Sequence, residues 1–439
     1  MLPPVPSLSF FSAAFSFSTA WRPPLPTVSN PGLLGTASSS PPIPRATDRI
    51  PELDGLRGIA IGLILILHFF QNTLNPQAGV VPRYLAAATR LTWSGVDLFF
   101  VLSGFLIGGI LLDARTAPNY YRVFYARRLF RIVPIYIVFL AAYAVLVYVL
   151  PLVSHADLSW LLDHPQPWYA YASFTQNFWM ATSGKIGTGA LAVTWSLAVE
   201  EQFYLTLPLL VRVLPLSSLF RFLLAGIFAA PLVRTLLFYS IPGSSIAAYV
   251  LMPCRADALL LGVLAAILLR DPEWRERITR ARLFFALAFP VLLLGIAYFT
   301  KAAWFVYSPL MVSVGLTWLP FFYFCVLLFA LTQRESWLSA VLRNPALCWL
   351  GAIAYGVYLF HQTILGAVLS FLGSGAPLIA RLQDLPVFAL ALAVTLLFAR
   401  LSWIYFERPL VHLGHSWKYD NASAPSELCL SPRAESAGS

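Results

Sequence analysis

The feature that most constrains this chain is a series of ten apolar segments, each long enough to cross a membrane as an α-helix. A helix rises about 1.5 Å per residue, so roughly 20 apolar residues cover the ~30 Å hydrocarbon core of a bilayer. The segments lie near residues 56–74, 93–112, 130–150, 191–214, 219–239, 247–269, 283–300, 308–332, 347–372 and 384–407. The sequence therefore predicts an all-α polytopic membrane protein of about ten transmembrane helices.

The composition agrees with this prediction. Only 11% of the 439 residues are charged, against roughly 25% in soluble domains. The net charge of +10 would also suit a nucleic-acid-binding protein, but the basic residues flank apolar segments instead of lining one polar domain. The four cysteines show no spacing typical of a zinc or redox site. We therefore expect the lipid bilayer as a partner, no nucleic acid, no disulfide and no metal.

Three regions follow from the pattern of hydropathy. Residues 1–48 are rich in proline and serine and are expected to form a disordered extension; a transit peptide or a misplaced start codon are the alternatives. Residues 49–410 form the predicted ten-helix domain. Residues 411–439 form a predicted polar tail, which is too short to be a second domain.

The distribution of basic residues predicts the orientation in the membrane. An even number of spans places both termini on one side. If that side is cytoplasmic, the inner loops hold twelve arginines and the outer loops five basic residues. This positive-inside bias predicts cytoplasmic termini and a multi-pass protein of the plasma membrane. The long loop near 151–190 is then outside, and we interpret its tryptophans and tyrosines as interfacial anchors in preference to a sugar-stacking surface.

Ionisable residues inside five of the spans fall at similar depths. Counting about 1.5 Å per residue from each cytoplasmic end places them roughly 18–22 Å into the membrane. They are His68, Asp97, Glu200, Glu201, Arg255, Asp257 and His361. Each such group costs a few kcal/mol and needs a partner, a water-filled cavity or a function. Structural ion pairs between helices are one interpretation, and a catalytic site is the other.

Two features of this layer favour a catalytic site. Arg255 and Asp257 are two residues apart on a helix, so they face away from each other and each must reach another span. The layer also contains two histidines beside several carboxylates, and a histidine with a carboxylate that orients it is the usual general-base pair.

A permanent cation and a deep histidine share one face of the first span. Arg57 and His68 are eleven residues apart, about three turns plus 20°, or ~16 Å along an ideal helix. Arg128 and Arg131 open the third span at the same end and are neighbours at i and i+3. Such a set suits an elongated anionic ligand that enters from the cytoplasm, although each arginine alone also fits an interfacial anchor. We interpret Asp54 as a helix N-cap.

The second span has a surface suited to close approach by another helix. Asp97, Gly104 and, roughly, Gly108 project on one face. Ser103 has no acid beside it in its own helix and does not stand in a nucleophile elbow, so we interpret it as a packing residue.

The fourth span carries adjacent acids. Glu200 and Tyr204 lie on one stripe at i and i+4. Glu200 and Glu201 point about 100° apart, so at most one of them is expected to meet His68, while the other meets a cation such as Arg255.

Five blocks of this sequence, in order, resemble the membrane-bound acyltransferase-3 family, which includes O-antigen and exopolysaccharide O-acetyltransferases. The blocks are residues 51–60 leading to His68, 95–108, 125–134, 194–204 and 350–361. The family pattern Arg-x10-His is met by Arg57 and His68, and Arg-x-x-Arg by Arg128 and Arg131.

The resemblance implies a ten-helix domain that uses cytoplasmic acyl-CoA, usually acetyl-CoA, as co-substrate with no bound cofactor. The acceptor would be a hydroxyl of an extracytoplasmic or membrane-associated molecule, commonly a carbohydrate or glycolipid. The resemblance also implies that His68 is essential, that Arg57 supports it, and that Arg128 and Arg131 lie near the donor.

We expect His68 to act as the general base, oriented by Glu200 or Glu201. Arg255 would stabilise the developing oxyanion. The remaining members of the intramembrane polar layer, Asp97, Asp257, His361 and Tyr204, are expected to support them. A covalent acyl-His68 intermediate is an alternative within the same class.

A secondary transporter with an intramembrane histidine and carboxylate layer is the competing class of protein. Paired Gly/Pro-interrupted repeats in the two halves, which would favour a transporter, are not found in the sequence. The sequence does not specify the acceptor.

Overall fold

A computed structural model of the protein describes residues 50–77, 79–149, 158–241, 243–302, 306–372, 379 and 384–420. The predicted extension, residues 1–48, lies outside the described residues, as does the tail after residue 420. Within these ranges the regular structure is helical, apart from an isolated bridge between Leu74 and Ile379. The predicted all-α class is confirmed.

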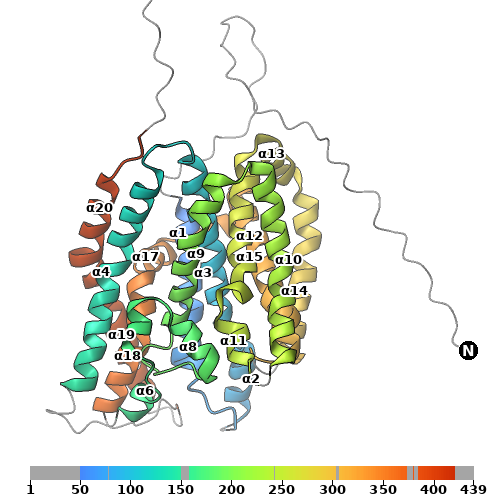
Figure 1. Ribbon diagram of the computed structural model, residues 1–439. Helices are drawn as coiled ribbons and strands as arrows, with labels where there is room; N and C mark the ends of the chain where they lie inside the picture. Colours follow the sequence, from blue (N-terminus) through green and yellow to red (C-terminus); the bar gives the residue numbers. More distant parts are fainter. Residues whose placement is uncertain are drawn as a thin grey trace, which may run out of the picture. The chain divides into compact units, whose positions relative to one another are not determined.

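The longest helices form a bundle (Figure 1). They are α1 (Pro51–Ile66), α3 (Gly95–Asp113), α4 (Tyr120–Tyr148), α9 (Thr194–Val213), α10 (Leu216–Ser240), α12 (Met252–Arg270), α14 (Arg282–Ala302), α15 (Leu316–Thr332), α18 (Ala354–Phe371) and α19 (Leu385–Ser402). Shorter helices connect them: α2 (Val80–Ala88), α6 (Ser159–Leu162), α7 (Trp168–Ala172), α8 (Gln176–Ser183), α11 (Ser245–Val250), α13 (Pro272–Arg280), α16 (Trp337–Leu342), α17 (Pro345–Ala352) and α20 (Arg408–Ser416).

Irregular turns extend several of these helices. A 3₁₀ turn, η2 (Thr92–Ser94), leads into α3. Three π-helical turns, in which a helix locally widens, are η1 (Leu67–Gln71) after α1, η3 (Met311–Gly315) before α15 and η5 (Trp403–Glu407) between α19 and α20.

The ten predicted spans each coincide with a helical segment. Among the described residues, nine helical segments are long and apolar enough to cross a membrane. The remaining predicted span forms α9, which has 20 residues but is less apolar because it contains Glu200, Glu201 and Gln202. The protein is therefore a multi-pass membrane protein.

Two helix boundaries differ from the prediction. Helix α4 begins at Tyr120, not near residue 130, because its first turns carry arginines that lower the local hydropathy without breaking the helix. At the other end of the chain, α19, η5 and α20 continue the helix to Ser416, past the predicted domain boundary at residue 410.

The bundle places α1, α3 and α9 between two groups of helices (Figure 1). Helices α4, α18, α19 and α20 lie on one side, and α10, α12, α14 and α15 lie on the other. Helix α13 lies at one end of the bundle, here called the α13 end, and α2, α8 and α11 lie at the opposite, α8 end.

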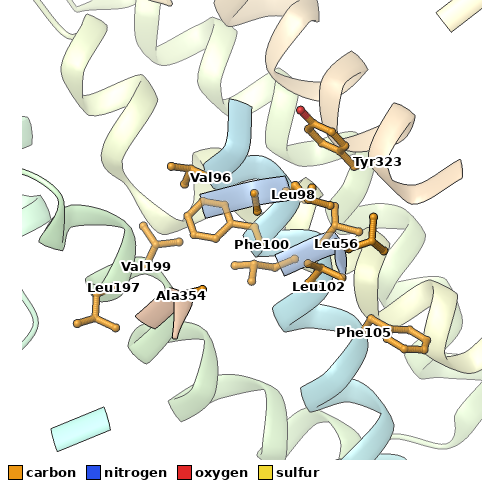
Figure 2. Packing of buried hydrophobic residues seen from close by; sticks show 14 of the residues in the cluster. Leu56, Val96, Leu98, Phe100, Leu102, Phe105, Leu197, Val199, Tyr323 and Ala354 are labelled. Carbon is orange, nitrogen blue, oxygen red and sulfur yellow. The ribbon is translucent and has the colours of Figure 1, made fainter. Parts of the chain in front are cut away.

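Helix α3 is mostly apolar and is buried in the centre of the bundle, as expected for a helix without a continuous polar face. Figure 2 shows its side chains spreading in two directions. Val96 and Phe100 point toward Val199 of α9, whereas Leu98 points to the side on which Tyr323 of α15 lies. All five of these side chains are buried.

Helices α3 and α12 approach each other closely. A Cβ atom at Gly104 would overlap the backbone of Leu259, and a Cβ atom at Gly262 would overlap the backbone of Val101. Gly108 packs against α12 in the same way, so the close-approach face predicted for the second span is confirmed. Lipid tails are as apolar as the helices, so the hydrophobic effect does not drive helices together inside a membrane. Small residues stabilise the contact instead, because they let the two backbones pack closely.

Candidate active site

A cavity of about 280 Å³ lies between α1, α3, α4, α9, α18 and η5. Its wall is apolar except for a set of charged and hydroxyl-bearing side chains. These are Arg57, Ser103, Arg128, Arg131, Ser196, Glu200, Tyr204, Tyr355, Tyr358 and Glu407. The structure therefore gathers the three arginines predicted to bind an anionic donor, from two different helices, on one wall.

The two α4 arginines of this cavity have guanidinium groups free for a ligand. Arg128 and Arg131 make no hydrogen bond or ion pair with the protein among the described residues, and both are half-buried. Arg57 instead donates to Asp54 across 2.9 Å. The prediction that Asp54 caps α1 is wrong, because the helix already begins after Ile50 and Asp54 lies within its first turn. Buried cations without a counter-ion are costly, so an anionic ligand between Arg128 and Arg131 would relieve that cost.

Their neighbour Arg127 has a structural role. Its Nε and Nη2 donate to the carbonyl oxygen of Trp417 across 2.9 and 2.7 Å, and its guanidinium lies over the ring of Tyr419. These contacts hold the chain after α20 against α4. Burial raises the pKa of Tyr419, although Arg127 and Arg128 act in the opposite direction.

A short chain of hydroxyl groups ends on the carboxylate of Glu200. The Tyr204 hydroxyl donates to Glu200 Oε2 across 3.0 Å, as expected for residues on one stripe. The same hydroxyl is 2.5 Å from Ser103 Oγ. Ser103 therefore packs against α9, and it also lines the cavity, a position that could not be read from its own helix. Glu201 does not line the cavity, and its buried Oε1 has no partner within the described part of the chain.

Glu407 is a cavity residue that the sequence analysis missed. It lies on the π-helical turn η5, is 4% exposed and accepts a hydrogen bond from Ser402 Oγ across 3.0 Å. Glu407 is the last residue of the last predicted span, a position typical of a residue at the membrane interface, and was therefore not considered as a site residue. A carboxylate directly after the apolar run Trp403–Phe406 was the available signal.

The two intramembrane histidines form a pair. His68 Nδ1 lies 3.0 Å from His361 Nε2. His361 Nδ1 lies 3.0 Å from the carbonyl oxygen of Val357 and 2.8 Å from that of Tyr358. His68 Nδ1 also lies 3.1 Å from the carbonyl oxygen of Ile64. His361 is fully buried, and His68 is half-buried.

This pairing corrects the expected imidazole–carboxylate contact. Neither Glu200 nor Glu201 hydrogen-bonds His68 in the described structure. Glu200 accepts its hydrogen bond from Tyr204, and the residue beside His68 is His361 of α18. The prediction failed because it assumed which helix faces α1.

The histidine pair lies next to the cavity without lining it. Arg57 lines the cavity and His68 does not. The two residues, predicted to lie on one face of the first span, therefore do not both face the cavity. Tyr358 is close to both the cavity and the histidine pair: it lines the cavity, and its ring centroid is 6.1 Å from that of His361. The cavity nevertheless extends to Val96, whose neighbour Gly95 packs against Ile64, one helical turn before His68.

The remaining charges of the predicted layer form two buried ion pairs on the far side of α3. Arg255 pairs with Asp97 of α3. Asp257 accepts from Arg234 of α10 across 3.3 Å and from Thr317 of α15 across 2.6 Å. The prediction that Arg255 and Asp257 must each reach another span is confirmed.

These pairs also revise the roles given to their members. Arg255 meets neither glutamate of α9 and does not line the cavity, so the structure does not place it where an oxyanion would form. Arg234 was missed, although an arginine in the middle of an apolar span was a visible signal. The layer thus divides into a histidine and carboxylate group near the cavity and a structural ion-pair group.

The fold and this site define a class: a multi-pass helical membrane protein with an arginine-lined cavity that ends beside a buried histidine pair. The sequence profile of the acyltransferase domain family, Acyl_transf_3, matches residues 50–403. The chain belongs to this family, and the resemblance seen in its motifs is confirmed. No solved structure was found to match it.

Several curated proteins are similar to the chain. A candidate O-acetyltransferase of Staphylococcus aureus strain COL is 27% identical over 82% of this chain and 57% of its own length. The candidate peptidoglycan O-acetyltransferase YrhL of Bacillus subtilis strain 168 is 28% identical over 82% and 55%. The O-acetyltransferase OatA of S. aureus strain NCTC 8325 is 26% identical over 83% and 58%. The chain therefore spans little more than half the length of these relatives.

Proposed function

We propose that this protein is an integral-membrane O-acyltransferase that moves an acetyl group from cytoplasmic acetyl-CoA to a hydroxyl of a carbohydrate or glycolipid acceptor. One observation carries the proposal: a cavity between membrane-spanning helices has on its wall two arginines without protein partners among the described residues, and it is also lined by Tyr358, whose ring lies 6.1 Å from that of His361 in the histidine pair. Membership of the acyltransferase domain family supports the same reaction class.

The donor would lie along the cavity. Its phosphates would bind Arg128 and Arg131, whose forked donors suit phosphate oxygens, with Arg57 completing the cationic group. The acyl end would then extend past Ser103 toward Val96 and the histidines. Side chains of the cavity wall would have to move for the thioester to reach His68, because His68 does not line the cavity.

The reaction needs one base. His68 would remove the proton from the acceptor hydroxyl while that oxygen attacks the thioester carbonyl. The C–S bond then breaks, coenzyme A leaves as the thiolate and takes the proton from His68, and the acceptor is left as an acetyl ester. In the alternative route, a nitrogen of His68 attacks the thioester carbonyl, the C–S bond breaks and coenzyme A leaves as the thiolate. The acceptor oxygen then attacks the acyl-His68, the C–N bond breaks, and the acceptor proton passes to the thiolate.

The orientation follows from the positive-inside rule. The arginine-rich loops are at the α13 end, so we propose that this end is cytoplasmic and that both termini lie there. The α8 end would face outward, and a multi-pass protein of the plasma membrane would thereby accept donor from inside and acceptor from outside.

The acceptor class is proposed from the relatives. All three relatives are named as O-acetyltransferases, and YrhL is named as a peptidoglycan O-acetyltransferase. Muropeptides are therefore the first acceptor to test, with other hydroxyl-bearing glycans as the second set.

The test is the release of coenzyme A from acetyl-CoA by the purified protein in detergent, with muropeptides present and ester formation followed by mass spectrometry. His68→Ala should abolish transfer. Arg128→Gln and Arg131→Gln should each raise the KM for acetyl-CoA roughly 10- to 100-fold, because a charge-assisted hydrogen bond contributes about 1.5–3 kcal/mol.

Arg221→Gln is the matched control and should leave the KM unchanged, because Arg221 is an exposed arginine of α10 whose one hydrogen bond among the described residues is to Ser218. Full transfer by His68→Ala, or equal KM effects at positions 128, 131 and 221, would contradict the proposal. Uptake of a solute by sealed vesicles without any release of coenzyme A would instead indicate a transporter.

A further inference from the structure

We infer that His361 is a positioning residue that holds His68 as the tautomer protonated on Nδ1, so that Nε2 is the nitrogen that takes the acceptor proton. The inference rests on the proposed function for its chemical consequence. The tautomer itself follows from the hydrogen-bond geometry of five groups: His361, His68 and the three backbone carbonyls beside them.

The first step concerns His361. Its Nδ1 lies 3.0 and 2.8 Å from the carbonyl oxygens of Val357 and Tyr358. A carbonyl oxygen only accepts hydrogen bonds, so His361 Nδ1 must carry a hydrogen. In a neutral imidazole the other nitrogen is then an acceptor, and His361 Nε2 presents a lone pair. Because the side chain is fully buried, solvent does not compete for either nitrogen.

The second step concerns His68. Its Nδ1 lies 3.0 Å from His361 Nε2 and 3.1 Å from the carbonyl oxygen of Ile64, and both of these are acceptors. His68 Nδ1 must therefore carry the hydrogen, which it shares between them. Its Nε2 keeps a free lone pair and has no hydrogen-bond partner in the described part of the protein.

This arrangement does for His68 what a carboxylate does for the histidine of a catalytic triad, which is to fix the ring and its tautomer. It differs in one respect, because a neutral imidazole lends no negative charge to the imidazolium that forms. His68 should therefore pass its proton on quickly, and the departing thiolate is a suitable recipient.

The test compares three substitutions at position 361. His361→Gln keeps an amide oxygen near the place of Nε2 and can still accept from His68 Nδ1. His361→Asn carries the same amide one methylene shorter, at the place of Nδ1, and leaves His68 Nδ1 with the carbonyl oxygen of Ile64 as its remaining acceptor. His361→Leu removes both groups. We expect kcat to fall about 10²- to 10⁴-fold in the Asn and Leu variants, with partial rescue by Gln and an unchanged KM for acetyl-CoA.

A direct readout is solid-state ¹⁵N NMR of protein labelled at the histidine ring nitrogens. The chain has six histidines, so the His68 signals are assigned from the difference between the wild type and His68→Ala. The wild type should show His68 protonated on Nδ1, and His361→Leu should show a mixture of the two tautomers.

A wild-type His68 protonated on Nε2 would overturn the inference, as would equal activity in the Gln and Asn variants. The wild-type spectrum decides the tautomer even if a variant fails to fold. If His68→Ala keeps its transferase activity, the proposed function fails, while the spectrum still reports on the histidine pair.

Discussion

Among single residues, what separates the buried charges is whether the protein supplies their counter-ions. Arg255 and Asp97 are both fully buried, and the Arg255 guanidinium also lies over the rings of Tyr249 and Phe100 at 5.2 and 5.8 Å. Such a pair is expensive to break, because the charge left behind has no water to solvate it. Arg128 and Arg131 of the cavity lack such partners among the described residues, which suits them to bind a ligand.

Asp97→Asn should lower the free energy of unfolding by about 3–5 kcal/mol, because it leaves Arg255 buried and uncompensated. Thermal unfolding in detergent measures the effect. The double change Asp97→Leu with Arg255→Met should cost less than Asp97→Asn alone.

The matched control is Asp113→Asn, which removes the pair between Asp113 and Arg270 that joins the same two helices at their other ends. Those side chains are 45% and 25% exposed, so the loss should be at most about 1 kcal/mol. Equal losses for Asp97→Asn and Asp113→Asn would show that burial does not set the cost.

Among the helices, irregular turns place the residues of the site. His68 stands on the π-helical turn η1 and Glu407 on η5, and such turns often occur at functional sites because they change the direction of the following side chains. The contact between α3 and α12 has the opposite character, since it is regular and depends on glycines.

Gly104→Leu should lower the melting temperature and the yield of folded protein, because the new side chain would overlap the backbone of α12 at Leu259. Overpacking of this kind costs about 1–3 kcal/mol or more. Gly62→Leu is the control: it also lies within a spanning helix, but a Cβ atom there would have no neighbouring atom within 4 Å. A Gly104→Leu variant as stable as Gly62→Leu would contradict the close packing of α3 and α12.

For the whole molecule, orientation is the property that assigns donor and acceptor to their sides. The α13 end carries most of the loop arginines, and the α8 end carries the loop with Lys185. In the proposed function, this asymmetry would place acetyl-CoA and the arginine-lined part of the cavity on the same side of the membrane.

The orientation is tested by cysteine accessibility in a variant whose four native cysteines have been replaced. Lys185→Cys, in an exposed loop at the α8 end, should react with a membrane-impermeant maleimide in intact cells. Glu276→Cys, exposed on α13, should react only after the membrane is permeabilised. The reverse pattern would invert the proposed topology and place the arginines on the outer side.

The sequence by itself determined the all-α class, the positions of the spans and the arginine group. These properties depend on the local run of residues: hydropathy over one helix length and the spacing of side chains along one helix axis. The early start of α4 at Tyr120 was missed for the same reason, because its arginines lower hydropathy while leaving helix formation intact.

Only the tertiary structure decided which residues meet. The sequence placed His361 at the right depth, but it could not show that His361, not Glu200 or Glu201, lies beside His68. Nor could it show that Glu407 faces the cavity. Contacts of this kind depend on which helices become neighbours and on their rotation through turns such as η1, and neither is encoded in the periodicity of a single helix. The 11% of charged residues that marked a membrane protein thus acquired their separate roles only when the helices packed.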